Sequence, residues 1–301
     1  MTKAWACIGL ICLLPGATAA GQEMQTNHVV EKVVTRDIPF SRNETLKIVG
    51  EKATVRVTGW NKDFVRVKLV FSAKSPDKPL AERELKYMKY ALSREGHTLE
   101  IRNTFIVPPE ITATQSRLGV AYEVAVPRDS KVQVIDQYGN VELASLAGEL
   151  DVAVGFGDIH LQNVAGRINV ESSYGEVRGD GIGGTFSCQS DKSDVYLDRI
   201  TARCTLNSTY GNIHLTLREK PQGLAVKASR TAVVVSTADF GAYRYGLRTS
   251  HASIYVPDPY KKYVKQPGDS GSSTLNFAGT PDNPLISIIT TFSPITIHTH
   301  P

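Results

Sequence analysis

One motif recurs through the middle of the chain at a constant spacing of 18 residues. It consists of an aromatic residue, glycine, a small polar residue and an alternating apolar pair, as in Tyr138-Gly139-Asn140-Val141-Glu142-Leu143. Further copies begin at Phe156, Tyr174 and Tyr210, and a variant copy with Lys192-Ser193 in place of the aromatic residue and glycine keeps the same spacing. Two short strands, which fill a unit of this length, cannot bury an apolar face alone, so successive units must stack on one another.

A second turn signal falls ten residues after each of the first four motif starts, at Gly148, Gly166, Gly184 and Ala202. Between the turns, apolar and polar residues alternate, which is typical of half-buried strands. Each unit therefore predicts two strands, each paired with its counterpart in the next unit. We expect an all-β fold in which residues 131–301 form a parallel β-solenoid, β-helix-like or β-roll-like, of ~18-residue coils.

The repeated motif predicts two columns of side chains at one corner of the coil. The rings of Tyr138, Phe156, Tyr174 and Tyr210 would form an aromatic ladder at the strand spacing of ~4.8 Å, which Lys192 interrupts. A polar column would cap the turns: Asn140, Asp158, Glu176, Asp194 and Asn212. The alternatives are a sugar-stacking platform at the ladder and a calcium site or acid–base chemistry at the polar column. Stiffening and capping are favoured, so we predict no catalytic residue, no metal ligand and no cofactor.

Residues 28–130 lack the repeat and predict a β-rich cap that continues into the solenoid. Residues 54–58 and 64–69 flank a turn and predict an antiparallel pair of strands. Pro79 predicts the first turn of the one α-helix of the cap, which would run to about Glu95 and end at Gly96. Such a helix commonly covers strand edges that would otherwise expose unpaired backbone.

The repeat becomes irregular towards the end of the chain. Arg230 follows Tyr210 after 20 residues, His251 follows after a further 21, and residues 257–273 predict a loop insertion. A last copy of the unit fits residues 285–297. Because Pro294 has no N–H to donate to a strand ladder, we expect this copy to cap the stack.

The first residues have the pattern of a secretory signal peptide. Lys3 provides the positive charge, residues 4–14 the apolar core, and Ala17 and Ala19 a small-residue cleavage site, so residues 1–19 are predicted to be removed. No later stretch approaches the ~20 apolar residues of a transmembrane helix. We expect an exported protein of the periplasm, the cell surface or the medium.

Composition excludes several classes of protein. With 41% hydrophobic and 21% charged residues the chain is globular rather than disordered. Its 34 basic and 30 acidic residues are intermixed, which argues against nucleic acid as a partner. Its four cysteines are too few for a disulfide scaffold. Cys188 and Cys204 would face inward on adjacent coils, and we favour buried free thiols over a disulfide.

Four short motifs have functional interpretations that we do not favour. Residues 268–271, Gly-Asp-Ser-Gly, match a serine-protease motif, but the upstream histidines lack the expected context, so a loop is favoured. Arg178-Gly179-Asp180, an integrin-binding tripeptide, falls within a predicted strand. Residues 260–265 interleave tyrosines and lysines in a predicted solvated loop. His298 and His300 lack a third metal ligand.

Several of these features occur together: the Gly59-Trp60-Asn61-Lys62-Asp63 turn, the helix, the strand end at residues 126–129 and the repeated units. From about residue 45 to the end, the combination resembles the bacterial "putative adhesin" domain of unknown function. The resemblance implies a cell-envelope or secreted β-repeat protein. We therefore expect an exported, non-enzymatic protein with an adhesin-like interaction or scaffold role, whose partner is an unknown envelope protein or glycan. The alternative is a polysaccharide-binding or polysaccharide-active β-helix protein.

Overall fold

The structure, a computed structural model, describes residues 27–265 and 271–299. The predicted signal peptide and His300 lie outside the described residues, as does most of the Gly-Asp-Ser-Gly motif. Within the described ranges the chain forms twenty-two strands, three short 3-10 helices and one α-helix. The prediction of an all-β fold is therefore confirmed.

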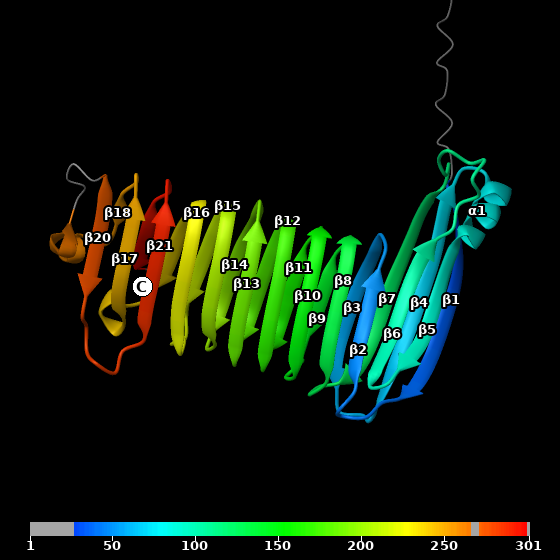
Figure 1. Cartoon of the computed structure of the whole chain (residues 1–301), viewed down its shortest axis with the longest axis horizontal. Coiled ribbons are helices and arrows are strands. Elements are labelled where there is room, and N and C mark those ends of the chain that lie inside the picture. The colour runs from blue at the N-terminus through cyan, green and yellow to red at the C-terminus, as the bar shows by residue number, and fades with distance from the viewer. Residues whose placement is uncertain (1–26, 266–270, 300–301) are drawn as a thin grey trace, which may run out of the picture.

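The repeat region consists of two layers of parallel strands that extend along the molecule (Figure 1). The first ladder contains β8 (Lys131–Tyr138), β10 (Glu149–Phe156), β13 (Thr185–Asp191) and the first halves of β12 (Arg167–Ile182), β15 (Arg203–Leu217) and β16 (Gly223–Thr237). The second ladder contains β9 (Val141–Ala144), β11 (Ile159–Val164), β14 (Ser193–Ile200) and the second halves of β12, β15 and β16.

The 18-residue spacing of the sequence repeat equals the offset at which strands of successive coils pair. Leu150 pairs with Ile168 and Ile168 with Phe186, each 18 positions further along, whereas β15 and β16 pair at an offset of 20. Residues at equivalent positions of successive coils therefore stack on one another. The inward-facing apolar residues form continuous rows between the two layers. One such row is Val152, Val170, Cys188, Leu206 and Val226, all buried.

The two cysteines of the described region lie within this core. Cys188 pairs with Leu206, and Cys204 with Phe186, which is the predicted offset of two residues. Both are buried and unpaired, as favoured from the sequence. Burial raises the pKa of each thiol to about 12, so both remain protonated.

Both ladders continue into the N-terminal region, where spatial order departs from chain order. The first ladder continues from β8 to β2 (Thr45–Gly50), β6 (Thr98–Phe105) and β5 (Met88–Glu95). The second continues from β9 to β3 (Ala53–Trp60), β7 (Arg117–Pro127), β4 (Phe64–Ser75) and β1 (His28–Pro39). The coil formed by β2 and β3 thus lies between β6–β7 and β8–β9, although it precedes both in the sequence.

The predicted antiparallel pairing of residues 54–58 with 64–69 is wrong. β3 and β4 lie on opposite sides of β7, with which β3 pairs in parallel and β4 antiparallel. The alternating pattern correctly indicated both strands. It carried no information on β7, which follows much later in the chain and occupies the position between them.

The helix of the cap is shorter than predicted. α1 (Lys78–Glu84) is followed by a 3-10 turn, η1 (Leu85–Tyr87), and then by β5, so the expected extension to Glu95 is wrong. Asp77 caps α1 by accepting a hydrogen bond from the Leu80 N–H. Glu84 is buried and accepts from the backbone N–H groups of Gln115 and Ser116. Pairing of β5 with β6 outweighs the local helical pattern beyond this anchor.

The C-terminal end shows a second exchange of order. β21 (Leu285–Thr291) and β22 (Ile295–Thr299) lie between β16 and the strands β17 (Arg244–Ser250) and β18 (Ile254–Tyr255). The expectation that residues 285–297 cap the stack is therefore wrong. Pro294 lies at the corner between β21 and β22, where its carbonyl accepts from the Val233 N–H and its missing donor costs no ladder bond. The end of the stack is instead formed by β20 (Ser272–Phe277) and β19 (Val264–Lys265).

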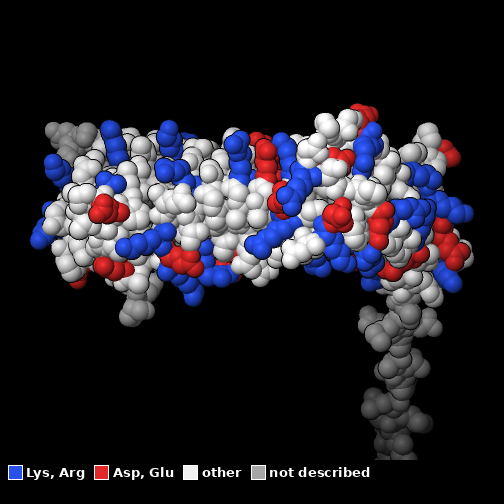
Figure 2. All heavy atoms as spheres, turned by 90° about the horizontal axis from the view of Figure 1, so that it is seen from below, with Lys and Arg blue, Asp and Glu red and all other residues white. Residues whose placement is uncertain are grey.

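The remaining elements are short. η2 (Phe240–Ala242) precedes β17, and η3 (Asp258–Tyr263) occupies the first part of the predicted loop insertion. Within the described residues, no helix has the length and apolar character that crossing a membrane requires. Seen from below, basic and acidic side chains both occur along the whole stack, with uncharged surface between them (Figure 2).

Candidate functional site

The aromatic column forms the corner between the two ladders. The rings of Tyr138 and Phe156 are 5.2 Å apart with an interplanar angle of 12°, and those of Phe156 and Tyr174 are 4.7 Å apart at 5°. Lys192 does not break the column, because its Nζ lies 2.7 Å from the Tyr174 hydroxyl and 4.8 Å from the ring centroid. The ring faces are therefore covered by their neighbours. A sugar-stacking platform needs open faces, so this geometry favours the stiffening role.

The column continues beyond the predicted residues. The Arg230 guanidinium carbon lies 5.5 Å from the Tyr210 ring centroid and 5.3 Å from that of Phe292, whose ring stacks on His251 at 4.9 Å. Rings and cations thus share one column, as cation–π contacts allow. The sequence did not indicate Phe292, because its coil comes last in the chain but lies between those of Arg230 and His251.

The polar column fastens successive coils together. The Oδ1 of Asn140 accepts from the Asp158 N–H at 3.0 Å, the Oδ1 of Asp158 accepts from the Glu176 N–H at 3.0 Å, and that of Asp194 accepts from the Asn212 N–H at 2.7 Å. These contacts favour the capping interpretation over a cation site. No group of three potential metal ligands occurs among the residues that the structure describes.

Close backbone approach explains the glycine of the motif. Gly157 has a φ of +148°, and a Cβ built on it would lie 2.0 Å from the Gly139 carbonyl oxygen. A side chain at this position would force adjacent coils apart. The glycine is therefore required by the stacking of coils rather than by a ligand.

A groove, here called the axial groove, crosses six neighbouring strands on the outer face of the second ladder and has a volume of about 640 Å³. Two columns of outward side chains form its sides, and the backbone between them forms its floor. The outer column is Arg56, Glu142, His160, Arg178, Tyr196 and His214. The inner column is Thr58, Ala144, Gln162, Asp180, Asp198 and Thr216.

Apart from Arg178 and Asp180, which the sequence offered only as part of an integrin-binding tripeptide that was not favoured, none of these residues is among the candidate positions of the sequence. As single residues, they look like the solvent-facing positions of amphipathic strands. The available signal was the register: positions 142, 160, 178, 196 and 214 all carry charged or hydrogen-bonding side chains and fall in one row. Only the stacking of the coils shows that two such rows enclose a groove.

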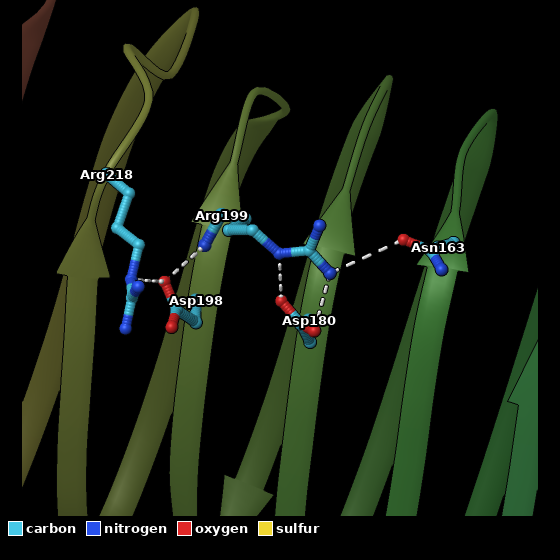
Figure 3. A network of polar contacts seen from close by, with 5 residues as sticks. All are labelled: Asn163, Asp180, Asp198, Arg199 and Arg218. Carbon is cyan, nitrogen blue, oxygen red and sulfur yellow. Dashed lines mark hydrogen bonds and ion pairs between the residues drawn. The ribbon is translucent and has the colours of Figure 1, made fainter.

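The acidic residues of the inner column are held by arginines of the adjoining corner (Figure 3). Arg199 contacts both carboxylate oxygens of Asp180 at 2.5 Å and also lies 3.5 Å from the Asn163 amide oxygen. The Arg199 hydrogen bond lowers the pKa of Asp180. Asp198 accepts from the Arg199 backbone N–H at 2.7 Å and pairs with Arg218 at 3.1 Å.

The charges of the outer column are paired as well. The Nε of Arg56 lies 2.7 Å from Glu142, and this hydrogen bond lowers the pKa of the Glu142 carboxyl. Arg178 pairs with Glu176 and lies 4.8 Å above the Tyr196 ring, which stacks on His214 at 5.0 Å and 8°. These contacts hold the side chains upright on the sheet.

Three side chains of the groove differ from its arginines and carboxylates in having no hydrogen-bond partner among the described residues. His160 and Gln162 are exposed and face one another across the floor. Within the described residues, neither side chain has a hydrogen-bond partner, and the same is true of the Tyr196 hydroxyl. The groove therefore combines paired charges with hydrogen-bonding side chains that make no hydrogen bond within the described part of the chain.

The remaining motifs have structural roles. Arg178 and Asp180 lie in strand β12, as expected, and both are ion-paired. The tyrosine- and lysine-rich segment is mostly exposed, as expected, although the Tyr260 ring stacks on Phe240 at 4.0 Å. His298 lies in β22.

Three solved structures are similar to this chain. A "putative cell adhesion protein" from Clostridium sporogenes has 8% identity and a TM-score of 0.28, with 90% of this chain and 100% of that chain covered. A "putative adhesin" from Bacteroides fragilis has 11% identity and a TM-score of 0.46 (89% and 97% covered). A "putative lipid binding protein" from Parabacteroides distasonis has 13% identity and a TM-score of 0.41 (88% and 96% covered). These TM-scores are too low to establish a shared fold.

A search of curated proteins gives no match. By contrast, residues 109–297 match the family described as Toastrack DUF4097, a domain of unknown function. The match covers more than half of the chain and includes every 18-residue unit. It confirms the resemblance to such a domain that the repeats indicated. The chain therefore belongs to the Toastrack DUF4097 family.

Proposed function

We propose that this chain is an exported, non-enzymatic β-solenoid of the bacterial envelope that acts as an adhesin-like binding scaffold. The signal-peptide pattern of residues 1–19 supports export. The in-register parallel ladders support the solenoid, since each coil is a copy of the last displaced by one strand spacing. The partner is an envelope protein or glycan that binds in the axial groove.

One observation carries this proposal: the axial groove has hydrogen-bonding side chains that make no hydrogen bond with any residue that the structure describes. His160 and Gln162 are exposed beside side chains that are held in ion pairs and ring stacks. A rigid surrounding with free donors and acceptors lowers the entropic cost of binding. The corner columns lack this property, because their rings and carboxylates are engaged by the next coil.

The ionisation of the groove carboxylates supports a binding role over catalysis. Glycoside hydrolysis needs one carboxyl with a raised pKa to act as the general acid. Arginine hydrogen bonds instead lower the pKa of both Glu142 and Asp180. A polysaccharide-active protein is therefore the less favoured candidate.

A matched pair of variants tests the groove. Ala144 and Ala153 are both half-buried, outward-facing alanines on neighbouring coils, but Ala144 lies in the groove and Ala153 on the outer face of the other ladder. The mature protein, Ala144→Trp and Ala153→Trp are co-sedimented with isolated bacterial envelopes. We expect Ala144→Trp alone to lose binding. Equal sedimentation of the two variants would contradict the proposal that the groove is the binding face.

A further inference from the structure

We infer that the axial groove binds a linear, uncharged saccharide chain that runs along the stack with one sugar ring at each coil. This inference rests on the proposed function, because it names the ligand class of the same groove. Three properties of the groove carry it: its hydrogen-bonding groups, its charge balance and its spacing.

The free groups of the groove are of the kind that sugar hydroxyls require. A hydroxyl both donates and accepts, and so do the amide of Gln162 and the phenol of Tyr196. The two ring nitrogens of His160 add further hydrogen-bonding positions. His160 and Gln162 face one another across the floor on the same strand, and Tyr196 lies two coils further along. A bound chain of hydroxyl groups would meet partners on both sides of the groove.

Charge balance argues against a charged ligand. Asp180 already has Arg199 as a partner, and Glu142 has Arg56, so an ionic ligand would have to displace an existing ion pair. Arg178 is likewise engaged by Glu176. A neutral ligand leaves every pair intact and still reaches the free groups between them.

Spacing distinguishes a saccharide from an extended peptide. Successive coils lie ~4.8 Å apart. One pyranose ring adds a similar, slightly greater length to an extended β-1,4-linked chain. An extended peptide advances only ~3.3 Å per residue, so its side chains would lose register with the coils within a few residues. The groove has six rows, so a matched saccharide would continue to gain contacts up to about six rings.

The groove is also preorganised for such a chain. Tyr196 is held between the Arg178 guanidinium and the His214 ring, at 4.8 Å and 5.0 Å from them. Its hydroxyl is thereby presented at a fixed position, and binding does not have to immobilise it. Because the ring faces are covered, the contacts with sugar are hydrogen bonds to side-chain edges rather than ring stacking.

The test is a length series in solution. Isothermal titration calorimetry is performed on the mature protein with β-1,4-linked oligomers of N-acetylglucosamine and, separately, of glucose, from about two to eight rings. We expect the Kd of one series to fall with each added ring up to about six, and then to stay constant, because the groove ends there. Absence of binding by both series at millimolar concentration would overturn the inference.

Substitutions in the groove test whether the saccharide binds there. His160→Ala and Gln162→Ala should each raise the Kd about three- to tenfold, the loss expected for one hydrogen bond. Gln189→Ala is the matched control, since Gln189 is also an exposed glutamine but lies on the outer face of the first ladder. Equal effects of Gln162→Ala and Gln189→Ala, or saccharide binding that survives Ala144→Trp, would contradict the inference.

The same variants separate this inference from the proposed function. If no oligosaccharide binds while Ala144→Trp still abolishes binding to envelopes, the groove is a binding face for another ligand, and only the saccharide is wrong. If extended peptides bind to the parent protein and this binding is lost in Ala144→Trp, the ligand is a protein segment. If Ala144→Trp binds to envelopes as well as the parent protein does, the proposed function itself is wrong.

Discussion

Asp136 packs directly against Gly50, so that a Cβ built on Gly50 would lie 2.4 Å from the Asp136 Oδ2. The two residues are paired between β8 and β2, where the repeat region meets the N-terminal coils. Asp136 is 1% exposed, and its Oδ2 has no hydrogen-bond partner within the described residues. Its Oδ1 accepts from the Tyr138 N–H at 3.0 Å. The junction therefore contains a buried, half-satisfied carboxyl.

We predict that this carboxyl makes stability fall as pH rises from about 4 to about 6. Burial raises the pKa of Asp136 to about 6, whereas an unfolded Asp titrates near 3.9. Between these values the folded state binds more protons than the unfolded state, so deprotonation costs about 3 kcal/mol of stability. Urea unfolding between pH 4 and pH 8 measures this slope.

Asp136→Asn isolates the contribution of this carboxyl, because asparagine keeps an acceptor for the Tyr138 N–H but does not ionise. We expect this variant to be more stable than the parent protein above pH 6 and to lose the part of the slope between pH 4 and pH 6. An unchanged slope would show that Asp136 is not the group responsible. Other carboxyls, whose pKa values are lowered by arginines, act in the opposite direction and remain in both proteins.

Arg199 combines an ion pair with an unfavourable backbone conformation. Its φ is +49°, and Gly181 occupies the same corner one coil earlier. Arg199→Ala removes the contacts with Asp180 and keeps the left-handed backbone, whereas Arg199→Gly removes the contacts and relieves the backbone. We expect Arg199→Gly to be more stable than Arg199→Ala by about 1 kcal/mol in urea unfolding. Equal stabilities would mean that this corner rearranges when the arginine is lost.

Phe156 tests whether the aromatic column stabilises the stack. Although 42% exposed, its ring is stacked between Tyr138 and Tyr174. Each aromatic pair contributes about 0.5–1.5 kcal/mol, so Phe156→Ala should cost about 1–3 kcal/mol. Tyr255→Ala, which removes a 57% exposed ring outside the column, is the control and should cost less than about 0.5 kcal/mol. A loss of equal size in both variants would contradict a stabilising ladder.

The sequence predicted contacts between coils that are neighbours in the chain, but not contacts between strands that are distant in the chain. The 18-residue register was accessible because each coil pairs with its neighbour in the chain, so one local pattern repeats. The insertion of β2–β3 between β7 and β8, and of β21–β22 between β16 and β17, was not accessible. Periodicity identifies a strand but does not choose between partners that are distant in the sequence.

The same limit applies to the candidate site. His160 and Gln162 are two positions apart, and alternation alone predicts that both face outward. Among the described residues neither side chain has a hydrogen-bond partner, whereas the neighbouring carboxylates are bonded by Arg199 and Arg56, which reach them from other coils. Which carboxylates are paired depends on the length of the arginine side chains and on the left-handed backbone at Arg199. A pattern of alternating residues contains neither.

The two core cysteines provide a chemical test of the packing between the ladders. Cys188 and Cys204 are buried, and their pKa values of about 12 leave almost no thiolate at neutral pH. We expect neither to react with an aromatic disulfide reagent in the folded mature protein, and both to react once the protein is unfolded in guanidinium without reductant. If the unfolded protein reacted only after a reductant was added, the two cysteines would form the disulfide considered from the sequence. The pairing of β13 with β15 would then have to differ from the register observed here. Rapid reaction of the folded protein would instead mean that these coils open, since a close-packed interior excludes the reagent.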